Sequence, residues 1–358
     1  MKKWEFSEDN ESFLKVLCES YAPSSLEVNV QKAIAQYLTS HGLECQGDAI
    51  GNLYASTNPS SDFHIGIIAH CDEVGVQITA IDDNGLLRFR KLGGLRATSL
   101  MGHRVVVLTD NGEVEGIVGS DPLQDNGTET GILVKTSDLW IDIGAESKSE
   151  CERLVAVGDF AILKSDILTL GKNRLVSKSL DNRLGGFVMS EVTSYFAHNN
   201  IDMDIVAVST VQEEINMGGI AACHIPFNVA IVIDVDFATD IPTAHTDMGR
   251  LSIGQGIGIN YNADSNSVLQ QILCEVAQKN DIPVQATLSR NISGGTDATI
   301  ARTIGNTATI NINIPLRYMH SHYEMCDIRD IEWVINAIIN LIEHINNNNI
   351  RNFVPWLQ

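Results

Sequence analysis

The chain is poor in basic side chains. Its 358 residues include 24 lysines and arginines against 45 aspartates and glutamates, which gives a formal net charge of −21. Nucleic acids and anionic membranes are bound through clusters of positive charge, so the composition argues against both as partners. The excess of negative charge favours solubility and allows acidic surfaces to gather cations.

Features that would indicate an oxidising compartment or a membrane are also missing. The seven cysteines form no C-x-x-C pair and are odd in number, so neither a disulfide framework nor a zinc knuckle is suggested. No apolar run approaches the roughly 20 residues that cross a bilayer. The N-terminal segment lacks the apolar stretch of a signal peptide. We therefore expect a cytoplasmic protein.

Signatures of nucleophilic catalysis are absent or weak. The chain has no G-x-S-x-G turn of the kind that serine hydrolases use. Cys71 stands between His70 and Asp72, but direct neighbours on a strand point to opposite faces, so His70 would not activate the thiol. Hydrolysis by a serine or cysteine nucleophile is therefore disfavoured.

The first part of the chain predicts the start of an α/β domain and then an all-β insert. A helix is expected within 24–42, with Ser24 and Glu27 as a capping box. A buried strand, Ile65 to Ala69, follows. From 73 to 165, apolar and polar residues alternate around Asp-Asn-Gly turns, which is typical of hairpins.

After the insert, strands and helices alternate again. We therefore predict an α/β domain in two pieces, 1–72 and 166–358, interrupted by a β domain over 73–165. The expected later strands cover 204–211, 228–236 and 307–312, and the expected helices cover 183–199, 265–280 and 327–349.

Acidic and histidine side chains follow the predicted strands. In open α/β sheets, ligands collect beyond the carboxyl ends of the strands, so these positions are informative. One further acid precedes a helix. The residues are His70 and Asp72, Glu213 and Glu214, Asp234 and Asp236, His320 and His322, and Asp181.

These groups together predict a metal centre, although each alone is a weak signal. Buried carboxylates that are brought together repel one another and lose their hydration, and cations remove that cost. Mixed histidine and carboxylate ligands suit zinc, cobalt or manganese. The acids are too many for one closed tetrahedral site, which indicates two ions that share a bridging carboxylate.

The adjacent pair Glu213 and Glu214 indicates a division of roles. Neighbours on an extended chain point in different directions, so one carboxylate can bind a metal while the other serves as a general base. His70 and Asp72 are two residues apart and face the same side, so Asp72 can orient the His70 ring. A solvated Glu-Glu turn would explain the charges but not the companion segments.

The stretch NISGGTDATIA, residues 291–301, has two interpretations. It lacks the spacing of a phosphate-binding P-loop. The glycines can form a turn with Thr296 or Asp297 as a helix N-cap. The same segment can line a substrate site where side chains would block approach. The candidate substrate-binding residues are Gly294, Gly295, Thr296 and Asp297.

Six motifs, in order, resemble the signature of the tetrahedral (TET) aminopeptidases. They are AHCDEVG, SLDNRLGG, VQEE, IDV, SGGTDA and RYMHS, and the likeness covers nearly the whole chain. The resemblance implies a three-layer α/β peptidase domain with a central mixed sheet and a β-barrel-like dimerisation insert. It also implies dimers that assemble into dodecamers and process short peptides.

Matched by position, the family pattern implies two metal sites with a shared ligand. His70 and Asp234 would hold one ion, Glu214 and His320 the other, and Asp181 would bridge them. Glu213 would be the general base, and Asp72 would support His70. Two divalent ions per subunit, zinc or cobalt and alternatively manganese, are therefore expected.

Several residues depart from the family pattern close to the site. LDN stands where Asp-Asp is usual, so Asp181 is the one bridging candidate in that motif. Asp236 stands where threonine is common, and His322 replaces a common proline. EEINMGG differs from the more glycine-rich continuation. The ligands remain, so these changes bear on substrate preference.

The sequence thus predicts a metal-dependent aminopeptidase in which Glu213 deprotonates a water activated by two metals. One alternative is a related dinuclear hydrolase that acts on small N-acylated amides. A second is a catalytically silent assembly protein, against which the presence of Glu213 argues. A glycosidase would leave the histidines unexplained.

Overall fold

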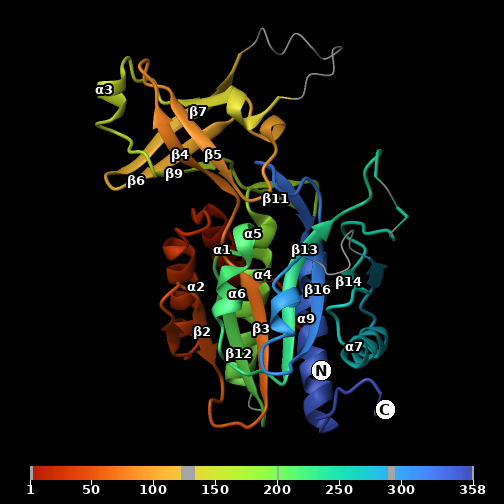
Figure 1. Ribbon diagram of the computed structural model, residues 1–358. Helices are drawn as coiled ribbons and strands as arrows, with labels where there is room; N and C mark the ends of the chain where they lie inside the picture. Colours follow the sequence, from red (N-terminus) through yellow and green to blue (C-terminus); the bar gives the residue numbers. More distant parts are fainter. Residues whose placement is uncertain are drawn as a thin grey trace.

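The computed structural model describes residues 3–121, 134–199, 201–244, 246–247, 249–288 and 295–356. It shows an α/β domain built around a mixed sheet, with a closed β-barrel at one end of that domain (Figure 1). This is the predicted fold class. No helix in the described ranges is long and apolar enough to cross a membrane.

The central sheet is mixed: its middle strands are parallel, two antiparallel pairs lie towards one edge, and towards the other edge one antiparallel pair is followed by a parallel pair. Strands buried on both faces read as continuous apolar runs, which is why the strands at 65–69, 204–211, 228–236 and 307–312 were recognisable in the sequence. In spatial order the described strands are β1 (Cys45–Gly47), β2 (Leu53–Ser56), β12 (Asp204–Thr210), β3 (His64–His70), β13 (Val229–Phe237), β16 (Ala308–Leu316), β14 (Ile257–Asn260) and β15 (Val284–Thr287).

Helices cover both faces of the sheet and make three layers. Alternate residues of one strand enter different cores: Ile231 of β13 packs on one side and Val232 on the other. On the first side lie α1 (Glu8–Glu19), α2 (Val28–Ser40), α4 (Leu180–His198), α7 (Ser267–Lys279) and α9 (Ile328–Asn347). The second core takes residues from α6 (Gly218–Ala222) and α8 (Ala298–Ala301), and α5 (Glu213–Asn216) precedes α6.

The insert closes into a barrel with its own apolar core. The alternating pattern seen in the sequence produces this shape, because one face of each strand points inwards. In spatial order its described strands are β4 (Gly75–Ile81), β5 (Leu87–Leu92), β8 (Leu139–Asp142), β7 (Gly112–Ser120), β6 (Arg104–Thr109) and β9 (Phe160–Leu163). The short helices of this region are η1 (Ala97–Ser99), η2 (Thr136–Asp138) and α3 (Lys148–Cys151).

A small antiparallel sheet holds the chain where it returns from the barrel. It consists of β10 (Leu168–Leu170), β11 (Arg174–Ser177) and β17 (Glu324–Asp327). At the same junction the buried carboxylate of Glu73 binds Lys178 Nζ at 2.9 Å and Arg183 Nη2 at 2.8 Å. Burial alone would raise the pKa of Glu73, but these two cations outweigh it and lower that pKa. The ion pairs thus fix the start of the insert to α4.

The predicted capping box at Ser24 and Glu27 was wrong. The helix begins at Val28, and the N-cap residue Glu27 makes no side-chain cap. Instead, Ser24 Oγ donates to Asp72 Oδ2 at 2.6 Å, and Glu27 Oε1 accepts from the backbone N–H of Ser25 at 2.7 Å. The buried Asp72 carboxylate needs a donor more than the solvated helix end does, so the tertiary partner takes the serine.

Candidate active site

The polar strand ends predicted from the sequence meet at one end of the sheet. β3, β12, β13 and β16 are parallel, so their carboxyl ends lie together. They border a cavity of about 510 Å³, which is within the range of small-molecule sites. Its lining includes His70, Asp181, Glu213, Glu214, Asp234 and His320.

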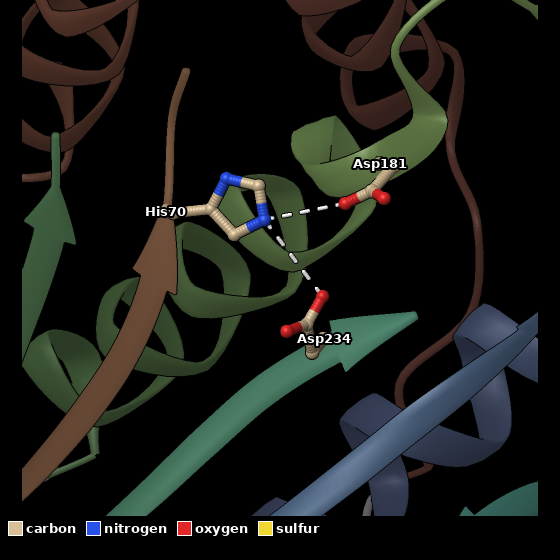
Figure 2. A group of neighbouring side chains, drawn as sticks. All are labelled: His70, Asp181 and Asp234. Carbon is tan, nitrogen blue, oxygen red and sulfur yellow. Dashed lines mark ion pairs between the residues drawn. The ribbon is translucent and has the colours of Figure 1, made fainter. Parts of the chain in front are cut away.

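The first ligand group consists of His70, Asp181 and Asp234, all buried (Figure 2). His70 Nε2 lies 3.2 Å from Asp181 Oδ1 and 3.8 Å from Asp234 Oδ1. His70 ends β3 and Asp234 lies on the neighbouring β13, while Asp181 comes from the irregular first turn of α4. The three side chains converge on one point, as a metal site requires.

The second ligand group shares Asp181 with the first. His320 Nε2 lies 3.1 Å from Asp181 Oδ2 and 3.3 Å from Glu214 Oε1. The two oxygens of one carboxylate therefore face two different histidines. Asp181 thus has the position of a bridging ligand between two groups.

Asp72 organises the residues around it. Its Oδ1 accepts the backbone N–H of Glu213 at 3.0 Å, and its Oδ2 accepts that of Glu214 at 3.2 Å. His70 Nδ1 lies 3.3 Å from Asp72 Oδ1, although the angle makes no hydrogen bond. Burial alone would raise the pKa of Asp72, but His70, Ser24 and Glu213 outweigh it and hold that pKa low. Asp72 therefore stays an anion that positions both glutamates.

Glu213 faces the ligand groups without belonging to either of them. Its Oε2 lies 3.9 Å from His70 Nε2. Burial is the main reason that the pKa of Glu213 is well above its usual range, and the nearby charges of Asp234 and Asp297 raise it further. A buried carboxylate with a raised pKa has the character of a general base or acid.

The donor set fits two divalent cations. Burial raises the pKa of Asp234 and of Glu214, so both carboxylates are short of compensating positive charge. Glu214 Oε1 is buried and has no hydrogen-bond partner in the described part of the chain. An orphaned carboxylate oxygen that faces a histidine and a second carboxylate has the environment of a metal ligand.

Glu324 is a site residue that the sequence analysis missed. Its carboxylate accepts the backbone N–H of Asp181 at 2.9 Å and that of His320 at 2.7 Å. It thereby connects the shared aspartate with the second histidine, and His320 itself has a positive φ of 60°. Burial, followed by the charge of Asp181, raises the pKa of Glu324 to about 8. Its position four residues after His320 was a signal, but nothing in the sequence gave its backbone partners.

The barrel also contributes to the site, through the turn Gly93–Gly94 after β5. A Cβ on Gly94 would lie 2.5 Å from His320 Nδ1. A Cβ on Gly93, which has a φ of 78°, would lie 3.3 Å from Glu214 Oε2. Gly94 lines the cavity. Nothing in the sequence pointed to a role for this turn.

Only part of the predicted substrate loop falls within the described residues. Gly295 and Thr296 line the cavity, whereas Gly294 lies outside the described residues. Asp297 is buried and accepts a hydrogen bond from Thr210. Thr296 Oγ1 accepts the Ala298 N–H at 3.1 Å, whereas the N-cap residue of α8 is Asp297, whose side chain makes no cap hydrogen bond.

The two unusual residues of the motifs have different surroundings. Asp236 lines the cavity, and burial raises its pKa while the Phe237 N–H and the Asn260 amide partly offset this. His322 is not among the described residues that line the cavity; its ring contacts that of His103 of the insert, with centroids 3.5 Å apart and the rings tilted by 37°. Burial and His103 lower the pKa of His322 to about 4.

Comparison with known proteins gives the same family as the motifs. The profile of the M42 glutamyl aminopeptidases matches residues 51–336. The lysyl aminopeptidase of Pyrococcus furiosus is 30% identical over 93% of this chain and 96% of its own length.

Solved structures agree with the sequence match. The TET aminopeptidase of the marine sediment archaeon Thaumarchaeota archaeon SCGC AB-539-E09 has a TM-score of 0.90 at 30% identity, covering 97% of this chain and 100% of that one. The Pyrococcus horikoshii TET1 peptidase, which can assemble into a tetrahedron or a large octahedral shell, has a TM-score of 0.82 at 30% identity, covering 93% and 98%.

Proposed function

Because the chain belongs to the M42 glutamyl aminopeptidase family, we propose that it removes N-terminal residues from short peptides with two divalent metal ions and Glu213 as general base. One observation carries this proposal. The two carboxylate oxygens of Asp181 face His70 and His320 separately, so two three-residue ligand groups share one aspartate.

The metal-binding roles follow from the two groups. His70 and Asp234 would hold one ion, Glu214 and His320 the other, and Asp181 would bind both. Zinc and cobalt suit these nitrogen and oxygen ligands, as does manganese. When bound, the ions supply Lewis acidity, which lowers the pKa of water and polarises a peptide carbonyl.

Glu213 carries the proton in this mechanism. It accepts a proton from the attacking water while the oxygen of that water forms a bond to the carbonyl carbon. It then donates the proton to the peptide nitrogen as the C–N bond breaks, which leaves a free amine and a carboxylic acid. Its burial and its raised pKa support this role, since a carboxylate with a raised pKa accepts a proton more readily.

Asp72 acts through its neighbours rather than on the substrate. By accepting both backbone N–H groups, it fixes the glutamate that we assign as base relative to the glutamate that we assign as ligand. The surplus of acidic groups around the cavity would also attract the α-ammonium of a peptide, which favours exopeptidase action.

The insert would provide the subunit interface. The Pyrococcus horikoshii TET1 peptidase can assemble into a tetrahedron or a large octahedral shell, and the barrel here is a compact domain with a separate core at one end of the molecule. We propose domains of 1–72 plus 166–358 and of 73–165, with dimers that assemble into a dodecamer. A cytoplasmic setting remains a prediction.

The first test removes and restores the metal. Chelation should abolish the hydrolysis of aminoacyl anilides, and zinc, cobalt or manganese should restore it. Metal analysis of the reconstituted protein should give two ions per chain. A protein that binds no divalent ion would contradict the proposal.

A substrate panel separates the alternative of an N-acyl amide hydrolase. An aminopeptidase should cleave anilides with a free α-amino group and leave their N-acetylated counterparts intact. The opposite preference would favour the deacylase, which would use the same metal ligands. A metal-loaded protein without activity on either set would favour the silent assembly protein.

A further inference from the structure

The cavity continues along the sheet, away from the predicted metal ligands. In the strand order β3-β13-β16-β14, His70 lies on the first strand, Asp236 on the second, Asn313 on the third and Asn260 on the fourth. All four residues line the cavity. The part of the cavity beyond the ligand groups therefore has a wall of one carboxylate and two carboxamides.

Asp236 is an acidic group to which the metal chemistry assigns no role. Two divalent ions would carry four positive charges, which balance the carboxylates of Asp181, Glu213, Glu214 and Asp234. Asp236 belongs to neither ligand group, and no lysine or arginine is among the described residues that line the cavity. Its hydrogen bonds come from neutral donors, the Phe237 N–H at 2.7 Å and the Asn260 amide. Its negative charge remains available to a ligand.

Asn313 is a second, independent sign of a missing ligand. Its side chain is 1% exposed, and neither Oδ1 nor Nδ2 has a hydrogen-bond partner in the described ranges. Asn313 is paired in register with Asp234 on the neighbouring strand, so both side chains lie on the same face of the sheet. Buried amides are rarely left unpaired, which indicates that a bound molecule completes this site.

The lining of the cavity also includes apolar side chains. Ile215, Met217, Phe237 and Met319 contribute to the lining, and Ile215 and Phe237 are 40% and 52% exposed. A lining that combines apolar side chains with a carboxylate matches a side chain that has an aliphatic stem and a charged end.

The position of Asp236 distinguishes a side chain from the α-ammonium. Asp236 is two residues beyond Asp234 on the same strand face, which corresponds to a separation of about 7 Å. The α-ammonium is bound to the carbon next to the scissile carbonyl, so it has to stay close to the ligand groups. The ammonium of a lysine side chain is separated from that α-carbon by four methylene groups, so it can reach Asp236.

We propose that Asp236 and Asn313 form a subsite for the cationic side chain of an N-terminal lysine or arginine. Asn260 is a positioning residue, because its amide also accepts a hydrogen bond from Thr287 and is thereby oriented towards Asp236. The inference rests on the proposed function of the site. Family membership does not decide which N-terminal residue is preferred, since the family is named for glutamyl substrates and the Pyrococcus furiosus relative for lysyl ones.

The test compares matched substrates and a matched substitution. The metal-loaded enzyme should cleave lysyl and arginyl anilides with a higher kcat/KM than norleucyl, leucyl or glutamyl anilides. In Asp236→Asn, which preserves size, kcat/KM for lysyl and arginyl substrates should fall about tenfold or more, while norleucyl hydrolysis stays within about twofold. Asp202→Asn is the control, because it removes one charge from an exposed residue that precedes β12 at the opposite end of the sheet.

A uniform loss over all substrates would assign Asp236 to the α-ammonium or to the scaffold and would overturn the subsite. An unchanged preference would overturn it as well. A binding measurement separates this inference from the proposed function. Calorimetry should show that lysinol binds more tightly than norleucinol, and Asp236→Asn should remove the difference. If no anilide is cleaved but this difference is found, the proposed activity fails and the subsite stands; equal affinities overturn the subsite.

Discussion

At the scale of single residues, the arrangement of the site depends on two aspartates, each of which directs its two carboxylate oxygens to two different partners. Asp181 presents one oxygen to each histidine, and Asp72 presents one oxygen to each backbone N–H of the glutamate pair. A carboxylate with two separated tasks is intolerant of replacement, because an amide has one acceptor instead of two. The site therefore separates Glu213 and Glu214 geometrically even though they are neighbours in sequence.

We predict different consequences for the two glutamates. Glu213→Gln keeps the size of the side chain but cannot accept a proton, so both ions should stay bound while kcat falls roughly 10²–10⁴-fold. Glu214→Gln should weaken one metal site, so the bound metal should fall towards one ion per chain and excess metal should partly restore activity. Metal content and turnover measured on the same samples check both expectations.

The reverse pattern, in which Glu213→Gln loses metal and Glu214→Gln keeps it, would exchange the two roles. Full metal content and full activity in both variants would reduce the pair to a solvated turn. Glu343→Gln is a suitable control, since Glu343 accepts a hydrogen bond from Tyr195 in the helical layer and is not among the described residues that line the cavity.

At the scale of elements, the barrel and the α/β domain complete the site together. The turn Gly93–Gly94 after β5 packs on His320 and Glu214, the two residues that complete the second ligand group. On the other side, β17 supplies Glu324, which binds the backbone at His320. His320 is thus held between a strand of the small sheet and a turn of the insert.

Gly94→Ala tests this arrangement. The new Cβ would lie 2.5 Å from His320 Nδ1, so the imidazole has to move. We expect the affinity of the second ligand group for metal to fall at least tenfold, and kcat to fall with it. A loss of this size is typical when a metal ligand loses a contact that orients it. Titration with cobalt, followed by its visible spectrum, checks the ligand environment.

The matched control is Gly186→Ala in α4, where the new Cβ would meet Ile34 Cδ1 at an ordinary 3.7 Å. This variant should keep both metals and normal turnover, and it should not lower the melting temperature, since alanine favours a helix. Unchanged cobalt binding in Gly94→Ala would show that the turn has no positioning role.

At the scale of the whole molecule, the insert is a domain whose first and last residues join the α/β domain at nearly the same place. Its first and last strands are neighbours in the barrel, with Val76 opposite Ala161. The two ends of the insert are therefore close together, as is common for inserted domains. Such a domain can be exchanged without interrupting the central sheet.

We predict that removing the insert abolishes the higher assembly. Replacement of residues 75–163 by a short glycine-serine linker should leave the α/β core folded. The molar mass measured by light scattering should fall from a multiple of the dimer mass to the mass of a single chain. The full-length chain of 39.1 kDa should give about twelve times that mass. Full oligomeric mass without the insert would contradict the interface assignment, and circular dichroism verifies that the shortened chain is folded.

The sequence by itself determined the central strands and which polar residues follow them. The apolar runs of β3, β12, β13 and β16 identified a parallel core, and parallel strands bring their carboxyl ends together, so the charged residues that follow them could be expected to meet. The alternating pattern of the insert likewise indicated its β structure. These features are readable because they repeat with the period of the secondary structure.

Tertiary structure alone decided which polar groups serve one another. Ser24 resembled a helix cap but binds Asp72, and Glu324, which no sequence motif singled out, holds Asp181 and His320. The approach of Gly94 to His320 was equally unreadable. Local patterns record which residues share an element or a face. Hydrogen bonds between distant segments depend on how those elements pack, and the need of buried polar groups for partners then selects among the donors that packing provides.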